Sequence, residues 1–156
     1  MTEKNASPVN YITEEILKDI CHEVAAGLFA IEEPMGLYAD HDEARLQASL
    51  ALPRQSFSGE ELYKGPYRKA AVLFYAINRN HAFGNGNKRL SVASLVVFLY
   101  INNIILKGSD AELRDKALWL AQVDERIERV IDHLAEWIEQ NSLEKTEYER
   151  INGPLK

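Results

Sequence analysis

Hydrophobic residues recur three and four positions apart along most of this chain, which is the spacing of one face of an α-helix. Polar residues fill the positions between them, so each predicted helix has one side for a core and one for solvent. Residues 88–102 differ because they are apolar on nearly all sides, which is typical of a helix at the centre of a bundle. The pattern predicts an all-α fold with helices at about 13–28, 42–51, 66–80, 88–102, 109–120 and 125–140.

Polar residues with capping chemistry mark several of the predicted helix ends. Thr13 precedes two glutamates, and Ser109 stands three residues before Glu112, which is the spacing of a capping box. Asn80 is expected to cap the end of its helix. The tail after Asn141 is polar and is expected to fray.

One stretch does not follow the helical pattern. Residues 54–66 lack a helical period and carry a Ser-Gly pair, so they predict a small hairpin or an ordered loop. No internal repeat, low-complexity run or linker interrupts the chain, and its 156 residues suit one compact domain.

The charge balance narrows the classes of partner. Eighteen basic and 24 acidic side chains give a formal net charge of −6, which argues against direct DNA binding and against anionic membrane surfaces. The strongest apolar stretch, 90–105, is too short for a membrane span and contains serines and asparagines. The N-terminus lacks the pattern of a signal peptide, and the single cysteine, Cys21, has no partner for an internal disulfide. We therefore expect a cytoplasmic protein with no membrane partner.

The segment between the third and fourth predicted helices is dense in functional groups and runs directly into the most apolar helix. A helix start offers unpaired backbone N–H groups and a positive dipole end, which suit a phosphate. Gly84 and Gly86 let the backbone approach an anion closely. Lys88 and Arg89 are unfavourable at a helix N-terminus unless an anion is near. His81 stands upstream, where an imidazole can take a proton from an attacking hydroxyl.

The spacing His81-x-Phe83-x-x-Gly86-Asn87-Lys88-Arg89 resembles the signature of the Fic/Doc family, and Lys88 places it nearer to the Doc (death-on-curing) branch. The resemblance runs from about residue 11 to about residue 122. It implies a Fic-like helical bundle with a short β-hairpin or loop as a flap. Residues 1–156 would form a single Fic/Doc domain, with a core at about 11–122 and a C-terminal helix at about 125–140.

The resemblance also implies a role for each motif residue. His81 would be the general base that deprotonates a Ser, Thr or Tyr hydroxyl, and Phe83 would anchor the loop in the core. A target chain would dock in an extended form on a flap that contains Gln55, Ser56 and Phe57. The phosphates of ATP or another nucleoside triphosphate would be held by Gly84, Gly86, Asn87, Lys88 and Arg89.

Four positions bear on the reaction that the resemblance implies. Lys88, and Val92 in place of a second arginine, are Doc-like and imply transfer of the terminal phosphoryl group, as by a protein kinase. Gly86 is the Fic-like choice and leaves protein nucleotidyl transfer (AMPylation) open. Asn85 stands where the family usually has an acidic ligand for Mg²⁺, and its amide oxygen brings no negative charge. A catalytically degenerate binding module is therefore the second alternative to the leading hypothesis, a Doc-like, toxin-type protein phosphotransferase.

The resemblance implies two protein partners. The first is a cytosolic protein substrate, for which a component of the translation machinery is the leading candidate. The second is an antitoxin, because the flanking helices hold no convincing copy of the inhibitory Ser/Thr-x-x-x-Glu-Gly/Asn pattern of some Fic proteins. Ser56 and Glu60 have the spacing but lie in the expected flap.

Other conspicuous side chains receive structural interpretations. Trp119 and Trp137 lie on amphipathic stripes and are expected in the core. Arg79 is expected at the surface, with a peripheral phosphate contact as the alternative. The remaining histidines lack a carboxylate or cysteine at metal-binding spacing and are expected to be structural: His22, His41 and His133.

Overall fold

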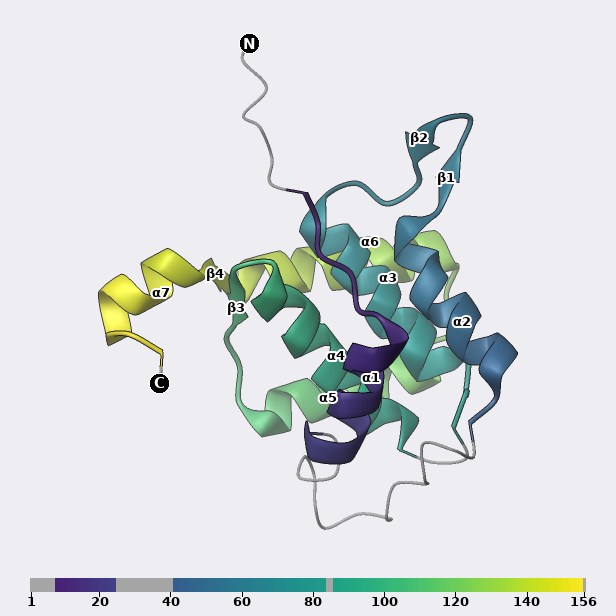
Figure 1. Cartoon of the computed structure of the whole chain (residues 1–156), viewed down its shortest axis with the longest axis horizontal. Helices are drawn as coiled ribbons and strands as arrows, with labels where there is room; N and C mark the ends of the chain where they lie inside the picture. The colour runs from purple at the N-terminus through teal and green to yellow at the C-terminus, as the bar shows by residue number, and fades with distance from the viewer. Residues whose placement is uncertain (1–7, 25–40, 84–85, 156) are drawn as a thin grey trace.

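The computed structural model of the chain describes residues 8–24, 41–83 and 86–155 (Figure 1). The first elements are α1 (Glu14–Asp19), a π-helical turn η1 (Ile20–Val24), α2 (Glu43–Ala51), a 3₁₀ turn η3 (Leu52–Arg54), and strands β1 (Ser56–Phe57) and β2 (Glu60–Glu61). The central helices are α3 (Gly65–Arg79) and α4 (Asn87–Ile101). They are followed by β3 (Ile104–Leu106), α5 (Asp110–Gln122), α6 (Ile127–Gln140), β4 (Ser142–Glu144) and α7 (Lys145–Asn152).

The core lies around the antiparallel pair α3 and α4. Helix α3 packs against α2, α4 and α6, and α4 packs against α5 and the π-helical turn η1. Helix α4 buries residues on every side, among them Leu90, Leu95 and Phe98, none of which exposes any measurable surface. The prediction of a mostly helical bundle with an all-apolar central helix is confirmed.

The predicted caps form as the sequence indicates. Thr13 Oγ1 accepts a hydrogen bond from the Ile16 amide at 3.2 Å, which starts α1. At α5 the Ser109 hydroxyl accepts from the Glu112 amide, and the Glu112 carboxylate accepts from the Ser109 amide. This reciprocal pair is the predicted capping box. Such bonds join residues three apart, so they are determined locally.

A hairpin or an ordered loop was predicted for residues 54–66, and the chain forms a hairpin there. Ser56 pairs with Glu61 and Phe57 with Glu60, and the connecting turn has positive φ at Ser58 and Gly59. Two successive positive φ angles match the right-handed twist of a two-residue hairpin. In Figure 1 the hairpin projects beyond the end of the bundle at which α3 begins.

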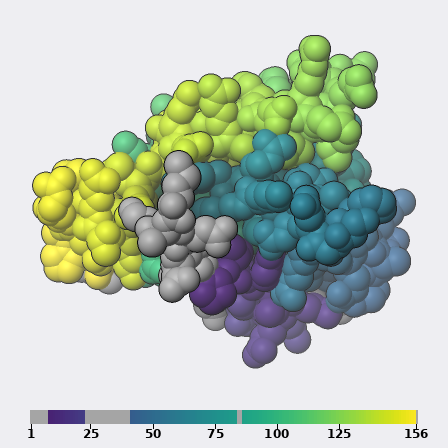
Figure 2. Space-filling model, turned by 90° about the horizontal axis from the view of Figure 1, so that it is seen from above, coloured from purple at the N-terminus to yellow at the C-terminus, as the bar shows by residue number. Residues whose placement is uncertain are grey.

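Two expectations about regular structure are wrong. The polar tail does not fray: Ile104–Leu106 pairs antiparallel with Ser142–Glu144, and α7 follows directly. The Lys107 amide donates to the Asn141 carbonyl at 2.6 Å, and the Lys145 amide donates to the Asn103 carbonyl at 2.8 Å, which continues the pairing at both ends. Figure 2 shows α7 in yellow at one end of the molecule. A pairing between segments nearly forty residues apart leaves no mark in a local pattern.

The first helix also differs from the prediction. Helix α1 ends at Asp19 and continues as the π-helical turn to Val24, and the rest of the expected helix lies outside the described residues. Within the described ranges, no helix has both the length and the apolar character that crossing a membrane requires.

Candidate functional site

The segment rich in functional groups connects α3 to α4. Helix α3 ends at Arg79, and Asn80 is its C-cap. The Asn80 backbone N–H donates to the Ala76 carbonyl, and its side-chain Nδ2 donates to Ser49 Oγ on α2 at 2.8 Å. Asn80 therefore caps α3, as predicted, and also ties the start of the loop to α2.

His81 is exposed and has a left-handed backbone, with φ of 50°. A non-glycine residue in this region is strained by roughly 1–2 kcal/mol, so neighbouring contacts must hold it. The flanking backbone has such contacts: the Asp42 amide donates to the Ala82 carbonyl at 2.7 Å, and Arg45 Nη1 lies 3.4 Å from the His81 carbonyl. The N-terminal end of α2 thus holds the loop in a conformation that presents the imidazole to solvent.

Phe83 and Asn87 close the loop from the inside. Phe83 is only 4% exposed, and its ring centroid lies 5.6 Å from that of His41. The Phe83 amide donates to Asn87 Oδ1 at 3.2 Å, and Asn87 Nδ2 donates to the Phe83 carbonyl at 2.8 Å. One side-chain amide therefore satisfies both backbone groups of Phe83, and this fixes the chain reversal just before α4. In this conformation the Asn87 side chain faces the loop backbone, and its predicted contact with a phosphate stays a prediction.

The start of α4 combines a permissive backbone with positive charge. Gly86 occupies the N-cap with φ of 79°, a conformation that side chains other than glycine adopt at a cost. The first turn carries no acidic residue, but it contains Lys88, which is exposed, and Arg89, which is 6% exposed. Cations at a helix N-terminus interact unfavourably with the positive end of the helix dipole. An anion bound there would offset this unfavourable interaction. Gly84 and Asn85 lie outside the described residues.

An open pocket of about 570 Å³ adjoins the loop. Its lining comes from α2 and from the end of α3, and His81 lies at its edge. Ala44 and Ala48, one helical turn apart, leave room on the α2 side, while Arg45 adds a cation that pairs with Asp42 at 3.7 Å. His81 is therefore accessible from this pocket.

The three predicted flap residues lie elsewhere. Gln55, Ser56 and Phe57 are all exposed, and Phe57 exposes 74% of its surface. They stand at the N-terminal end of α3, whereas His81 follows its C-terminal end, and the 15 residues of α3 span about 22 Å. The structure therefore brings together the motif residues that it describes, but not the motif and the flap.

Sequence reasoning missed the residue that holds the flap. Lys69 is 1% exposed, and its Nζ donates to the Pro53 carbonyl at 3.1 Å and to Glu61 Oε1 at 3.2 Å. The two contacts tie both sides of the hairpin base to α3. A lysine inside the apolar stripe of α3 was the available signal, because a charged group at a core position needs a partner.

Two interpretations of single residues are corrected. Arg79 is half-buried rather than on the surface: its Nη1 donates to the carbonyls of Leu120 and Val123 at 3.1 and 3.0 Å, which satisfies the C-terminal end of α5. The expectation that His41 has no carboxylate at metal-binding spacing is also wrong, because its Nε2 donates to Glu43 and a carboxylate oxygen of Glu14 lies within 4.8 Å.

The two tryptophans pack against the core at its margin. Trp119 and Trp137 are half-buried and line an open pocket of about 400 Å³. Lys116 Nζ lies 5.0 Å from each ring, and burial lowers the pKa of its ammonium group. The lysine occupies the aromatic surface that a ligand would need, which agrees with the structural interpretation of these rings.

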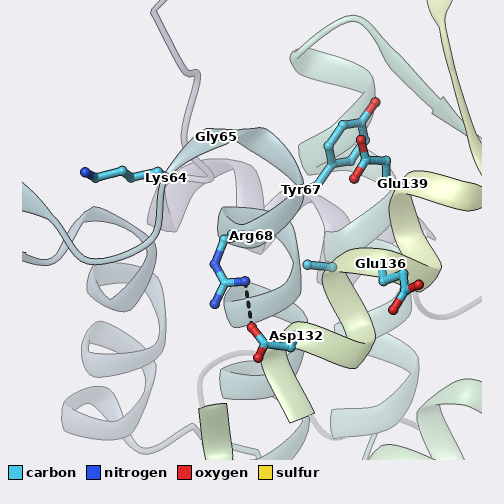
Figure 3. A pocket seen from close by; sticks show the side chains of 8 residues that line it. Lys64, Gly65, Tyr67, Arg68, Asp132, Glu136 and Glu139 are labelled. Carbon is cyan, nitrogen blue, oxygen red and sulfur yellow. Dashed lines mark hydrogen bonds and ion pairs between the residues drawn. The ribbon is translucent and has the colours of Figure 1, made fainter. Parts of the chain in front are cut away.

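A further pocket, of about 330 Å³, lies between the start of α3 and α6 (Figure 3). Arg68 Nη1 donates to Asp132 Oδ1 at 2.7 Å across it. Burial, and to a smaller extent the charges of Glu139 and Glu144, raise the pKa of the Tyr67 hydroxyl. The pocket contains no residue of the motif, and the ion pair between Arg68 and Asp132 joins α3 to α6.

Comparison with known proteins bears on the family. A sequence model of the Fic/DOC family matches residues 11–99, which is more than half of the chain. Toxin Doc of Mycolicibacterium smegmatis is 38% identical over 65 residues, a match that covers 42% of this chain and 50% of that toxin. The chain therefore aligns with about half the length of this relative, and the region of the family match includes both the hairpin and the α3–α4 loop.

Proposed function

The chain belongs to the Fic/DOC family, and from that premise we propose that it is a Doc-like protein phosphotransferase. It transfers the terminal phosphoryl group of ATP, or of another nucleoside triphosphate, to a Ser, Thr or Tyr hydroxyl of a cytosolic protein. Residues 1–156 act as one domain, since α6 packs on α3 and β4 pairs with β3.

The observation that carries this proposal is the juxtaposition of His81 with the α4 N-terminus. His81 has an exposed side chain that lines an open pocket. The helix start that follows in the same short loop carries Lys88 and Arg89. The backbone N–H groups of the first helical turn and the two cations are suited to the oxygens of a triphosphate. Gly86 allows the phosphates to approach the backbone closely.

The reaction then needs positioning and charge neutralisation more than covalent help from the protein. The imidazole of His81 takes the proton of the target hydroxyl, and the hydroxyl oxygen forms a bond to the γ-phosphorus. The bond from that phosphorus to the β–γ bridging oxygen breaks, and the nucleoside diphosphate leaves. Mg²⁺, when bound with the nucleotide, neutralises phosphate charge. Asn85 is its proposed protein ligand and lies outside the described residues.

The target chain is proposed to approach along α2 and α3. The flap residues Gln55, Ser56 and Phe57 offer an exposed strand edge and an apolar ring. About 22 Å separates the two ends of α3, which an extended target segment of roughly seven residues spans. A flexible segment of a translation component suits this geometry. An antitoxin that covers His81 or the flap would block the same path.

The test is transfer of label from ATP to protein targets by the purified full chain. Label from the γ position alone on a protein band supports the phosphotransferase. We expect His81→Ala to lower the rate by about 10²- to 10⁴-fold, because the general base is lost. His22→Ala, at another exposed histidine, is the matched control and should leave the rate unchanged.

Gly86 favours one alternative, protein nucleotidyl transfer, because glycine at this N-cap is the Fic-like choice. Label from the α position on the target would establish that reaction and refute phosphoryl transfer. No transfer from either position, even by Asn85→Asp with Mg²⁺ present, would support a binding module instead. Activity gained in Asn85→Asp would identify the missing carboxylate as the limiting feature.

A further inference from the structure

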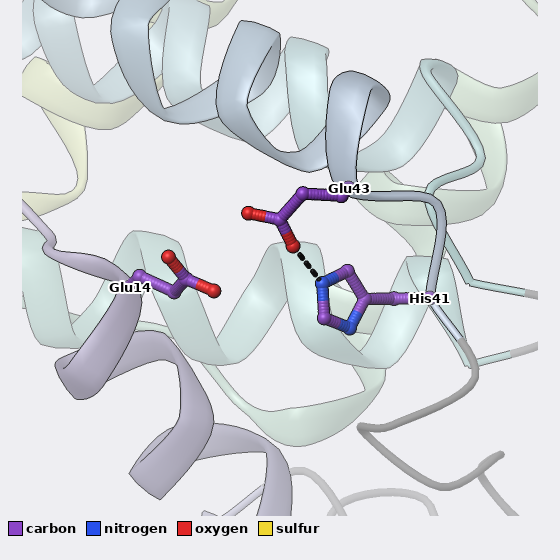
Figure 4. Close-up of side chains that lie close together, drawn as sticks. All are labelled: Glu14, His41 and Glu43. Atoms are coloured by element: carbon purple, nitrogen blue, oxygen red, sulfur yellow. Dashed lines mark hydrogen bonds and ion pairs between the residues drawn. The ribbon is translucent and has the colours of Figure 1, made fainter.

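Three side chains lie close together near the α3–α4 loop: Glu14 of α1, His41, and Glu43 of α2 (Figure 4). One ligand atom of each, an imidazole nitrogen or a carboxylate oxygen, lies within 4.8 Å of the other two. Twenty-seven positions separate Glu14 from His41, so only the fold brings them together. None of the three belongs to the motif.

The cluster differs from an acidic surface patch in its histidine. The His41 side chain is only 9% exposed, and its Nε2 donates to Glu43 Oε2 at 2.5 Å, whereas the Glu43 side chain is 58% exposed. Gln47 Nε2 donates to Glu14 Oε2 at 2.8 Å and to Glu43 Oε1 at 2.9 Å. One amide thus orients both carboxylates, and one oxygen of Glu43 remains directed at the imidazole, as Figure 4 shows.

We propose that Glu14, His41 and Glu43 bind a divalent transition-metal ion, of which Zn²⁺ is the best match. Zn²⁺ accepts imidazole nitrogens and carboxylate oxygens as ligands, and zinc sites with three protein ligands hold water in the fourth position. Mg²⁺ prefers oxygen ligands alone, so the imidazole discriminates against the ion that the nucleotide would bring.

The hydrogen bond between His41 Nε2 and Glu43 Oε2 marks the place that an ion would take. The metal takes the place of the proton between His41 Nε2 and Glu43 Oε2. In a tetrahedral zinc site two ligand atoms stand roughly 3.4 Å apart, for bonds of about 2.0–2.1 Å. The two exposed glutamates reach that spacing by rotating their side chains, while the buried ring stays in place.

The consequence for the loop follows from the contacts of residues 41 and 42. The His41 ring packs against Phe83, and the Asp42 amide donates to the Ala82 carbonyl. A metal that joins Glu14 to His41 therefore links α1 to the two loop residues next to His81. The metal site would form whichever reaction the loop performs.

The experiment measures binding of Zn²⁺ alone to the full chain by competition with a chromophoric chelator. We expect one ion per chain, retained in millimolar Mg²⁺. Both His41→Ala and Glu14→Gln should lower the affinity at least about ten-fold. Glu14→Gln is the decisive variant if His41→Ala does not fold, because Glu14 is exposed. His133→Ala and His81→Ala are the matched controls, and both should retain the site.

A second measurement follows the amide of Asp42 by hydrogen exchange. Zn²⁺ should slow its exchange in the wild type and leave it unchanged in Glu14→Gln. The proposal is overturned if the wild type binds no Zn²⁺. It is equally overturned if Glu14→Gln binds Zn²⁺ as tightly as the wild type, or if His133→Ala or His81→Ala abolishes the site.

Discussion

After the C-terminal end of α3, the turn at Phe83 is held by bonds between near neighbours, whereas before the N-terminal end of α3 the hairpin is held by one buried lysine of the helix. Asn87 satisfies both backbone groups of Phe83, four residues away. Lys69 reaches Pro53, 16 residues earlier, and Glu61, eight residues earlier. The turn at Phe83 is thus held within the motif itself, although α2 also holds the loop through Asn80 and Ala82. The proposed docking end depends on a contact outside the segment that it holds.

Substitution of two exposed lysines tests most directly whether the two ends of α3 have different functions. Lys88→Ala should lower transfer by roughly 10- to 100-fold, because it removes positive charge from the helix start that is proposed to hold phosphates. Lys64→Ala, at the other end of α3, is the control and should change transfer less than two-fold. Initial rates with γ-labelled ATP measure both, and equal losses in the two variants would contradict a localised phosphate site.

Asn87→Ala tests whether the loop is held locally. The substitution leaves the amide and the carbonyl of the buried Phe83 without their partners, which should lower the free energy of unfolding by about 2–3 kcal/mol. Urea denaturation measures the change. Asn87→Asp retains the acceptor for the Phe83 amide and loses the donor, so we expect a smaller loss. Equal stability of the wild type and Asn87→Ala would show that the two bonds do not hold the loop.

Lys69→Met tests the anchor of the hairpin. Methionine fills most of the buried space but cannot donate to Pro53 or Glu61, so the free energy of unfolding should fall by about 1–2 kcal/mol. Amide exchange of Leu62, whose N–H donates to the Gln55 carbonyl, should accelerate while exchange in α4 does not. Glu61→Gln keeps an acceptor for the lysine and should behave nearly as the wild type. Unchanged exchange of Leu62 in Lys69→Met would assign the anchor to other contacts.

Phe57→Ala should have the smallest effect on stability and still reduce target modification. Because the ring is 74% exposed, its removal should change the free energy of unfolding by less than about 0.5 kcal/mol. If the flap docks the target, modification of the protein target should fall while affinity for the nucleotide stays constant. Leu62→Ala, at a neighbouring exposed apolar position, is the control. Unaltered target modification in Phe57→Ala would place docking elsewhere.

Features with short-range causes were predictable from the sequence. The caps at Thr13 and Ser109 join residues three apart, and the hairpin turn follows from Ser58-Gly59. The family resemblance was likewise carried by residues within one nine-position motif, and the family match confirms it. The strand β3 was not predicted, because its partner lies nearly forty residues later and neither strand has a β pattern of its own.

By itself, then, the sequence determined the helical class, the capped helix starts at Thr13 and Ser109, and the order of chemical groups along the α3–α4 loop, because each depends on neighbours within one or two helical turns. Only the tertiary structure decided which distant groups meet. It placed Arg79 on the carbonyls at the end of α5, Lys69 under the flap, and Glu14 beside His41. Buried polar groups must find partners wherever the packed backbone offers them, and that choice is made by the fold as a whole.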